Sequence, residues 1–101
     1  MYVPREQIFV LYNTQMAPYV VEFLGTLLLI ATIAFSGNPA LIVAAFAFAV
    51  GLGGKISGGH FNPAVSTWAW FSGKLTTPDY SMYIVAQLGA GVLVWVLASM
   101  T

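Results

Sequence analysis

A short stretch, Gly58 to Ser66 (GGHFNPAVS), most constrains the fold, because it breaks two long apolar regions with glycines and an Asn-Pro pair. Asn62 is a residue type that caps helices well, and Pro63 suits the first helical position, where its missing N–H would have no partner in any case. The apolar and aromatic residues 64–72 that follow are too few to cross a bilayer. The sequence therefore predicts a loop that dips into a membrane, followed by a half-length helix that starts at mid-depth and runs back out.

The composition is that of a membrane protein. The 101 residues are 59% hydrophobic and 6% charged, whereas about a quarter of the residues of an average soluble domain are charged. Three Lys/Arg balance three Asp/Glu, so the chain has no basic surface for nucleic acid. It contains no cysteine, which excludes disulfides and thiolate metal sites. Arg5 and Glu6 precede a mixed segment rather than a clean apolar core, so we expect no cleaved signal peptide.

Three segments have the length and apolarity of transmembrane helices, at about residues 17–36, 40–54 and 79–100. About 20 residues at about 1.5 Å each cover roughly 30 Å, the thickness of a hydrocarbon core. In the second segment Ala45, Ala49 and Gly53 fall four apart, which gives a smooth face for close helix contact. The glycines near its end predict that this helix stops at Gly54.

The remaining residues form two further parts. Residues 1–16 mix polar and apolar types, and we expect them in the cytoplasm or at the membrane interface, either as a short surface helix or as a partly ordered tail. Residues 55–72 are the predicted re-entrant loop and half-helix. Residues 17–101 are therefore expected to form one all-α membrane unit with three transmembrane helices plus one re-entrant half-helix.

The positive charges predict the orientation of the chain. Arg5 precedes the first span, and Lys55 and Lys74 flank the re-entrant segment, which enters and leaves on the side of the N-terminus. All three positive side chains then lie on one side, and the positive-inside rule places that side in the cytoplasm. If residues 63–72 crossed the bilayer fully, Lys55 and Lys74 would lie on opposite sides and the bias would weaken.

The residues of the loop suit contact with a passing solute. Irregular backbone at membrane depth is tolerated only when it is buried in protein or lines a water-filled cavity. Gly58 and Gly59 let the chain turn and bring its carbonyl groups close to a solute. The side-chain oxygen of Asn62 can accept from the first free N–H groups of the helix, which leaves its NH2 to donate to water or a polyol. The alternative is an ordinary Asn-Pro turn between two helices.

Two polar side chains, Glu22 and Gln87, fall inside the first and third spans. A carboxyl group in hydrocarbon must find a partner, so Glu22 should face protein or water. One interpretation is a proton relay or ion site. The other is that both side chains satisfy backbone N–H groups of the irregular loop. A relay needs a second ionisable group inside a span, and the sequence offers none, so we favour support of the loop.

We expect no metal, no cofactor and no enzymatic activity. His60 is the only histidine, and a stable metal site needs three or four ligands. We therefore expect His60 to orient the loop or to line a pore. The chain has no cysteine and no second histidine, and no Ser or Asp is placed to form a catalytic triad.

Three motifs resemble signatures of the major intrinsic protein family, the aquaporins and glycerol facilitators. Residues 56–66 (ISGGHFNPAVS) resemble the first Asn-Pro-Ala (NPA) loop of the family. Residues 22–26 (EFLGT) resemble its first-helix signature, and residues 86–89 (AQLG) its third-helix signature. The motifs occur in the family's order, and the resemblance covers about residues 17–100.

The resemblance implies a membrane channel for passive transport of water or small neutral solutes such as glycerol. It assigns the NPA motif to Asn62, Pro63 and Ala64 and the pore-lining loop to Gly58, Gly59, His60 and Phe61. It places a filter position near Ile42, and it leaves the support of the loop by Glu22 and Gln87 as inferred above from the residues. Water or small polyols, the lipid bilayer and a second aquaporin-like half or oligomer would be its partners.

The sequence also departs from the family pattern. Family members resemble a pair of inverted repeats with two NPA loops, and this chain carries the first repeat only. The Arg that follows the second NPA in the family's filter has no counterpart, since Val65 follows the NPA here. The second half could be an inverted second copy, a separate partner or a continuation of the chain in its full gene. The one-sided Lys/Arg distribution argues against an inverted second copy.

Two other functions are consistent with the sequence. The first is a non-conducting membrane interaction protein that modifies full-length channels, which the missing second half favours. The second is a repeat of a secondary transporter, because such proteins also use broken helices. The lack of an ion-coupling cluster argues against the transporter.

Overall fold

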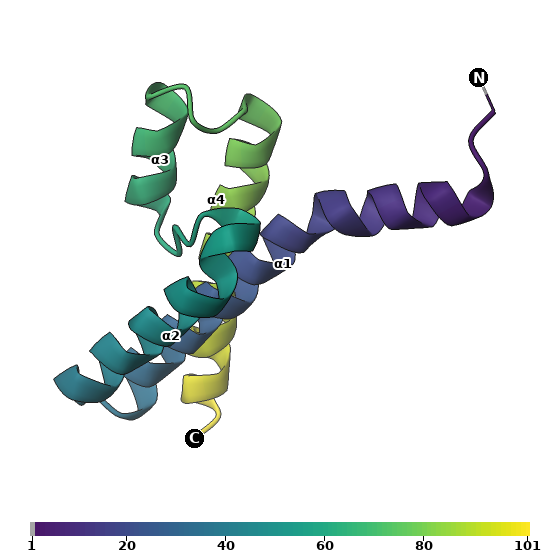
Figure 1. Cartoon of the computed structure of the whole chain (residues 1–101). Coiled ribbons are helices and arrows are strands. Elements are labelled where there is room, and N and C mark those ends of the chain that lie inside the picture. Colours follow the sequence, from purple (N-terminus) through teal and green to yellow (C-terminus); the bar gives the residue numbers. More distant parts are fainter. Residues whose placement is uncertain (1) are drawn as a thin grey trace.

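The computed structural model describes residues 2–101 apart from the Tyr12 side chain, and within this range it contains four helices and no strand. In chain order they are α1 (Arg5–Phe35), α2 (Pro39–Ser57), α3 (Pro63–Phe71) and α4 (Thr77–Ser99) (Figure 1). The helices α1, α2 and α4 are long and apolar enough to cross a membrane. The helix α3 has nine residues and is only about 14 Å long. The expected all-α class, with three long helices and one short one, is confirmed.

Packing between the helices centres on α1 and α4. The helix α1 packs against both α2 and α4, and α3 packs against α4. Figure 1 shows α3 beside the first turns of α4, with its N-terminus directed toward the middle of the bundle. The loop between α2 and α3 thus lies at mid-height, while α4 continues well beyond it.

Asn-Pro pairs begin two of the helices. Asn38 Oδ1 accepts hydrogen bonds from the backbone N–H groups of Ala40 and Leu41 at 2.9 and 3.2 Å, and Pro39 is the first residue of α2. Asn62 Oδ1 accepts from the N–H of Ala64 at 2.7 Å ahead of α3. The helix start expected after Asn62 is therefore present, because the amide oxygen replaces a missing partner of the first turn.

The helix α2 ends later than we expected. It runs through Gly54 to Ser57 and stops at Gly58, whose φ of 90° is left-handed and whose N–H donates to Gly54 O at 2.8 Å. The prediction that the loop begins at Lys55 was therefore wrong. Gly53, near the end of α2, instead allows α2 to pack closely against α1, because a Cβ on Gly53 would lie 2.6 Å from Val21 Cγ1. The helix stops only where a left-handed backbone favours glycine.

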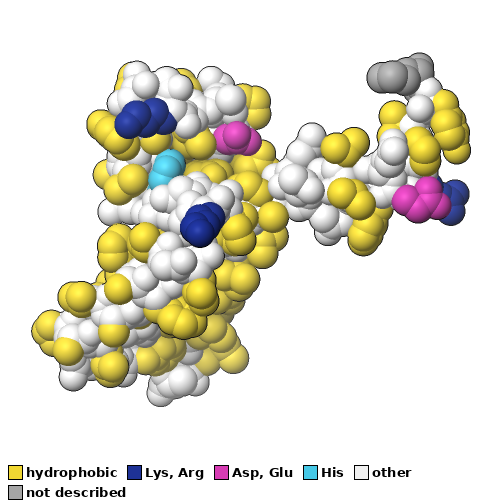
Figure 2. All heavy atoms as spheres, viewed as in Figure 1, with side chains coloured by type: hydrophobic (Ala, Val, Ile, Leu, Met, Phe, Trp, Pro, Cys, Tyr) yellow, Lys and Arg dark blue, Asp and Glu magenta, His cyan; other side chains and the backbone are white. Residues whose placement is uncertain are grey.

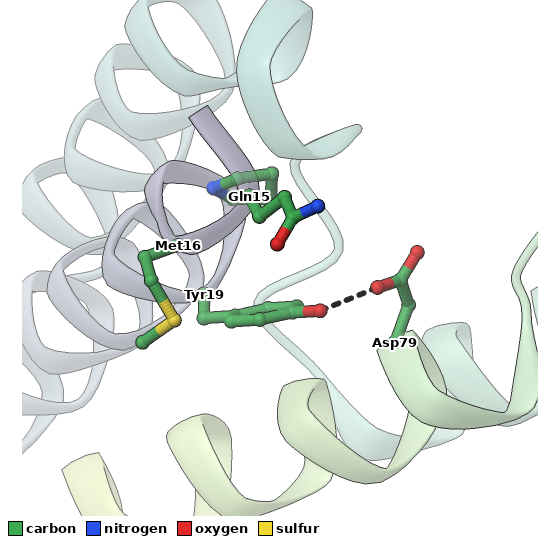
Figure 3. Close-up of a pocket in the computed structure, with 5 residues that line it drawn as sticks. Gln15, Met16, Tyr19 and Asp79 are labelled. Atoms are coloured by element: carbon green, nitrogen blue, oxygen red, sulfur yellow. Dashed lines mark hydrogen bonds between the residues drawn. The ribbon is translucent and has the colours of Figure 1, made fainter. Parts of the chain in front are cut away.

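The first helix also begins before the expected span. Of residues 1–16, those from Arg5 onward are helical and continuous with α1, whose 31 residues extend about 46 Å. That length exceeds a hydrocarbon core of about 30 Å, and Figure 1 shows the N-terminal part of α1 projecting away from the bundle. Where α1 meets the bundle, Tyr19 Oη donates to Asp79 Oδ1 at 2.6 Å (Figure 3). This hydrogen bond links α1 to the start of α4.

Small and polar side chains make up most of the interior, with Phe61, Tyr83 and Val94 as its larger members, and most large apolar side chains face outward. Buried apolar residues include Ala49, Ala69 and Ala90, whereas Trp95 is 70% exposed and Phe71 79% exposed. Figure 2 shows apolar side chains over the outside of the bundle. Such an inversion suits a chain that lipid surrounds, since lipid tails supply no hydrophobic force to bury these groups.

Candidate functional site: the loop between α2 and α3

The Glu22 carboxylate lies at the centre of the site and is fully buried. Its Oε1 accepts hydrogen bonds from the Phe61 N–H at 2.7 Å and from Gln87 Nε2 at 2.9 Å. Its Oε2 accepts from Ser57 Oγ at 2.7 Å and from the His60 N–H at 3.0 Å. Four donors surround the two oxygens, which is about the full accepting capacity of a carboxylate.

This carboxylate replaces the backbone partners that the loop lacks. Residues 58–62 lie between two helices and are not helical, so the N–H groups of His60 and Phe61 have no helical acceptor. Buried N–H groups left without a partner cost free energy, and a membrane interior supplies no water to satisfy them. Glu22 therefore connects α1 directly to the main chain of the loop.

Three side chains to which the sequence analysis gave no role complete the network. Ser57 Oγ accepts from the Gly59 N–H at 3.1 Å, and Tyr83 Oη donates to the Ser57 carbonyl at 2.6 Å. Ser66 Oγ accepts from Gln87 Nε2 at 2.8 Å. Ser57, Ser66 and Tyr83 are all buried. Both serines lie within residues 56–66, so their short hydroxyl side chains were the available signal, whereas nothing in the sequence near Tyr83 indicated a role in the loop.

His60 sits between the loop and α4. Its Nδ1 lies 2.9 Å from Ser66 Oγ, and its ring packs edge-on against the Tyr83 ring with centroids 5.2 Å apart. The side chain is partly buried. These contacts with Ser66 of α3 and Tyr83 of α4 fix the orientation of the imidazole.

Phe61 has a packed side chain rather than an open one. Its φ of 53° lies in the left-handed region, which non-glycine residues rarely adopt. The residue is 2% exposed, and a Cβ on Gly25 would overlap the Phe61 ring. The Phe61 side chain therefore packs inside the protein, against Gly25 of α1.

The NPA residues form the exposed tip of α3. Asn62 and Ala64 are exposed and Pro63 is half-buried. The Asn62 Oδ1 atom is engaged by the Ala64 N–H, and within the described residues no hydrogen bond from the Asn62 amide nitrogen occurs. Within the described residues, the Asn62 amide nitrogen therefore keeps its N–H donors without a partner.

Ile42 lies far from the loop between α2 and α3. It is half-buried in the first turns of α2, fifteen residues and about 22 Å along the helix from Ser57. A filter role for Ile42 would place the filter well away from the loop.

Comparisons with known proteins identify the family. Residues 11–101 match the family described as Major intrinsic protein. The chain is 40% identical over 93 residues to Aquaporin-8 of Rattus norvegicus, a match that covers 81% of this chain and 35% of that protein. It is 38% identical over 82 residues to Glycerol uptake facilitator protein-like 6 of Lactiplantibacillus plantarum, covering 72% of this chain and 38% of that protein.

A third relative is Aquaglyceroporin AqpS of Rhizobium meliloti, 37% identical over 89 residues, with 72% of this chain and 38% of that protein covered. These matches span between 35% and 38% of the length of the relatives. No solved structure matches the chain significantly. With a family match over residues 11–101 and three helices able to cross a membrane, the chain is an integral, multi-pass membrane protein that belongs to the major intrinsic protein family.

Proposed function

We propose that this chain forms one half of a channel for the passive flow of water or small neutral solutes such as glycerol. The names of its relatives support this class of solute, since they are an aquaporin, a glycerol uptake facilitator-like protein and an aquaglyceroporin. Transport would depend on pore width and on hydrogen-bond donors and acceptors, without covalent chemistry.

The position of Asn62 carries the proposal. Its side-chain oxygen is engaged in the cap of α3, and within the described residues its exposed amide N–H groups have no partner. They lie at the N-terminal, electropositive end of the helix. A donor in that place binds the oxygen of water or a hydroxyl and disfavours cations. The Asn62 amide would therefore orient each solute as it passes mid-membrane.

The Glu22 network supports a static role for the carboxylate. The Glu22 carboxylate accepts hydrogen bonds from two N–H groups of the loop, from Ser57 and from Gln87. Its oxygens therefore have no accepting position left for an ion. Support of the loop therefore fits the geometry better than a proton relay. A rigid loop keeps the Gly58 and Gly59 main chain and the His60 ring in place along the solute path.

The whole channel requires a second half, because the chain spans under two fifths of its curated relatives. The partial length also favours a second candidate function, a non-conducting protein that associates with full-length channels and changes their assembly. The two functions differ in one observable: only the first produces flow through a pore that contains Asn62.

Osmotic swelling of proteoliposomes tests the proposal. The vesicles would contain this chain together with the part of the Lactiplantibacillus plantarum relative that lies beyond the matched segment. Asn62→Asp retains a good cap but removes the donor, and we expect the swelling rate to fall about tenfold, the effect of one unsatisfied polar group. Asn38→Asp is the matched control, because it makes the same change at the other Asn-Pro cap.

An equal effect of both substitutions would contradict the proposal, because it would indicate a general loss of stability. Absence of swelling in every combination, with altered swelling only when a full-length relative is present, would favour the modifier instead.

A further inference from the structure

A pocket separate from the α2–α3 loop lies where α1 meets the start of α4. Five residues line it, and its volume is about 440 Å³; they are Gln15, Met16, Pro18, Tyr19 and Asp79. Asp79 is the last charged residue of the sequence and directly precedes the uncharged residues 80–101. Because the hydrocarbon core begins where such uncharged segments begin, the pocket lies at the depth of the lipid headgroups.

The polar groups of the pocket face one another from two helices. Tyr19 Oη donates to Asp79 Oδ1 at 2.6 Å. The Tyr19 ring packs edge-on against the Tyr83 ring with centroids 6.1 Å apart, so the phenol is held in place. Figure 3 shows the Gln15 amide directed toward the Tyr19 hydroxyl and the Asp79 carboxylate. The pocket therefore offers one carboxylate oxygen, one phenol oxygen and one amide oxygen as acceptors.

The negative charge of Asp79 favours a positively charged ligand. The residue is partly buried, and no Lys or Arg side chain within residues 2–101 donates a hydrogen bond to it. Lys74 is the positive residue nearest to it in the sequence, but the Lys74 Nζ lies over the Trp68 ring of α3, 4.8 Å from its centroid. A partly buried charge is stabilised by an opposite charge, which a ligand can supply here.

The residues of the pocket select a primary ammonium among cations. Ca²⁺ takes about six or more oxygen ligands, and the described residues contain no group of three His, Cys, Asp or Glu that could hold a metal ion. A quaternary ammonium is bound by a cage of aromatic rings, whereas the described part of the pocket has one ring, that of Tyr19. A primary ammonium brings N–H donors for all three acceptors, and its methylene groups can contact Met16 and Pro18.

An apolar stripe on α1 leads from the pocket toward the hydrocarbon core. Met16, Val20 and Leu24 are spaced four apart, so they share one face of the helix. Val20 and Leu24 are 50% and 54% exposed. An acyl chain can lie along this stripe while the headgroup of the same lipid occupies the pocket, which favours a lipid over a soluble amine.

We propose that this pocket binds the ammonium group of phosphatidylethanolamine, with Asp79 as the charged acceptor and Gln15 and Tyr19 as the neutral ones. The inference does not depend on the proposed channel function, because none of these residues belongs to the loop or to its network.

Native mass spectrometry of the detergent-solubilised chain tests the site. The chain is mixed with equal amounts of phosphatidylethanolamine and phosphatidylcholine that have the same acyl chains and differ in the methyl groups on nitrogen. We expect the first bound lipid to be phosphatidylethanolamine about ten times more often, the effect of a charge-assisted hydrogen bond on affinity. Asp79→Asn should bring this ratio close to parity. Glu6→Gln is the control, because it removes the same charge at an exposed position that does not line the pocket.

A second variant keeps the test valid if Asp79→Asn disturbs the fold, which circular dichroism would reveal. Gln15→Leu removes a neutral acceptor at an exposed position, and we expect it to lower the ratio about threefold. Gln7→Leu makes the same change at another exposed position of α1, outside the pocket, and should leave the ratio unchanged.

A competition experiment separates the lipid from a soluble amine. Glycerophosphoethanolamine carries the same ammonium without acyl chains, and at the concentration of the lipid we expect it to displace none. Displacement would overturn the lipid as the ligand. Equal occupancy by the two phospholipids, or a ratio that neither Asp79→Asn nor Gln15→Leu changes, would overturn the ammonium site itself.

Discussion

At the scale of single residues, the loop is held by contacts that leave little freedom for substitution. Glu22 accepts four hydrogen bonds while fully buried, and the Phe61 ring fills the space that the absent side chain of Gly25 leaves. Phe61 takes a left-handed backbone conformation that costs free energy, and its buried ring compensates. Both residues act through shape and hydrogen bonding rather than through charge at the surface.

The first prediction concerns the Glu22 carboxylate. Glu22→Gln replaces one accepting oxygen by an NH2 group, so two of the four donors would face another donor. We expect the free energy of unfolding to fall by about 3 kcal/mol, measured by SDS titration in mixed micelles. Glu6→Gln, an exposed position of α1, is the control and should change the midpoint little. A tolerated Glu22→Gln would mean that the loop does not depend on the carboxylate.

The second prediction concerns the contact between Gly25 and Phe61. Gly25→Val should lower the free energy of unfolding by about 3 kcal/mol, because the added side chain overlaps the Phe61 ring. Gly89→Val is the control, since a Cβ there would meet no atom within 4 Å. Adding Phe61→Ala to Gly25→Val should recover part of the loss in a double-mutant cycle. Additive effects in that cycle would contradict the contact.

At the scale of helices, the short α3 is fixed at both of its ends. The Asn62 cap defines its start, and Trp70 packs on Tyr80 near its end, where Trp70 Nε1 also donates to Thr77 Oγ1 at 3.0 Å. A helix of nine residues is too short to be stable alone. Its stability must therefore come from α4, which α1 in turn holds in place.

The third prediction concerns the link between α1 and α4. Tyr19→Phe removes the hydrogen bond to Asp79 while it keeps the ring that packs edge-on against Tyr83 at 6.1 Å. We expect a loss of about 1 kcal/mol in the free energy of unfolding. Tyr2→Phe, at a residue that is 86% exposed, should have no effect. The same SDS titration measures both variants, and equal midpoints for the two would exclude a role for the link.

At the scale of the whole molecule, charged side chains are absent from two long stretches of the chain. The sequence has no Asp, Glu, Lys or Arg in residues 23–54 or 80–101. On the face in Figure 2, charged side chains lie over α3, the C-terminal end of α2, the start of α4 and the N-terminal part of α1, and the opposite end of the bundle shows apolar and uncharged groups. This distribution supports our prediction that the N-terminus lies in the cytoplasm and that the α2–α3 loop enters the membrane from the same side.

The fourth prediction tests that orientation. Ser36→Cys lies in the turn between α1 and α2, and Ser72→Cys lies after α3; neither changes the three positive charges. In intact cells, a membrane-impermeant maleimide should label position 36 and leave position 72 unlabelled until the cells are permeabilised. Equal labelling of both positions in intact cells would indicate insertion in two orientations. An inverted second copy of this chain would then be the favoured second half of the channel.

Much of the architecture could be predicted because it depends on local chemistry. The apolar segments predicted three long helices, and the Asn62-Pro63 pair predicted the start of a short one, since a cap requires only residues close in sequence. The end of α2 could not be predicted in the same way. Gly53, Gly54 and Gly58 look alike in a sequence, but only Gly58 takes the left-handed conformation that stops the helix.

The sequence by itself determined that the chain is a membrane protein with a broken third segment, because hydropathy and capping act over a few residues. The tertiary structure decided which groups meet there. Glu22 and Phe61 are 39 positions apart and Glu22 and Gln87 are 65 apart, so their contact depends on how α1 packs against its neighbours. For the same reason only the fold distinguishes the buried ring of Phe61 from the exposed amide of Asn62.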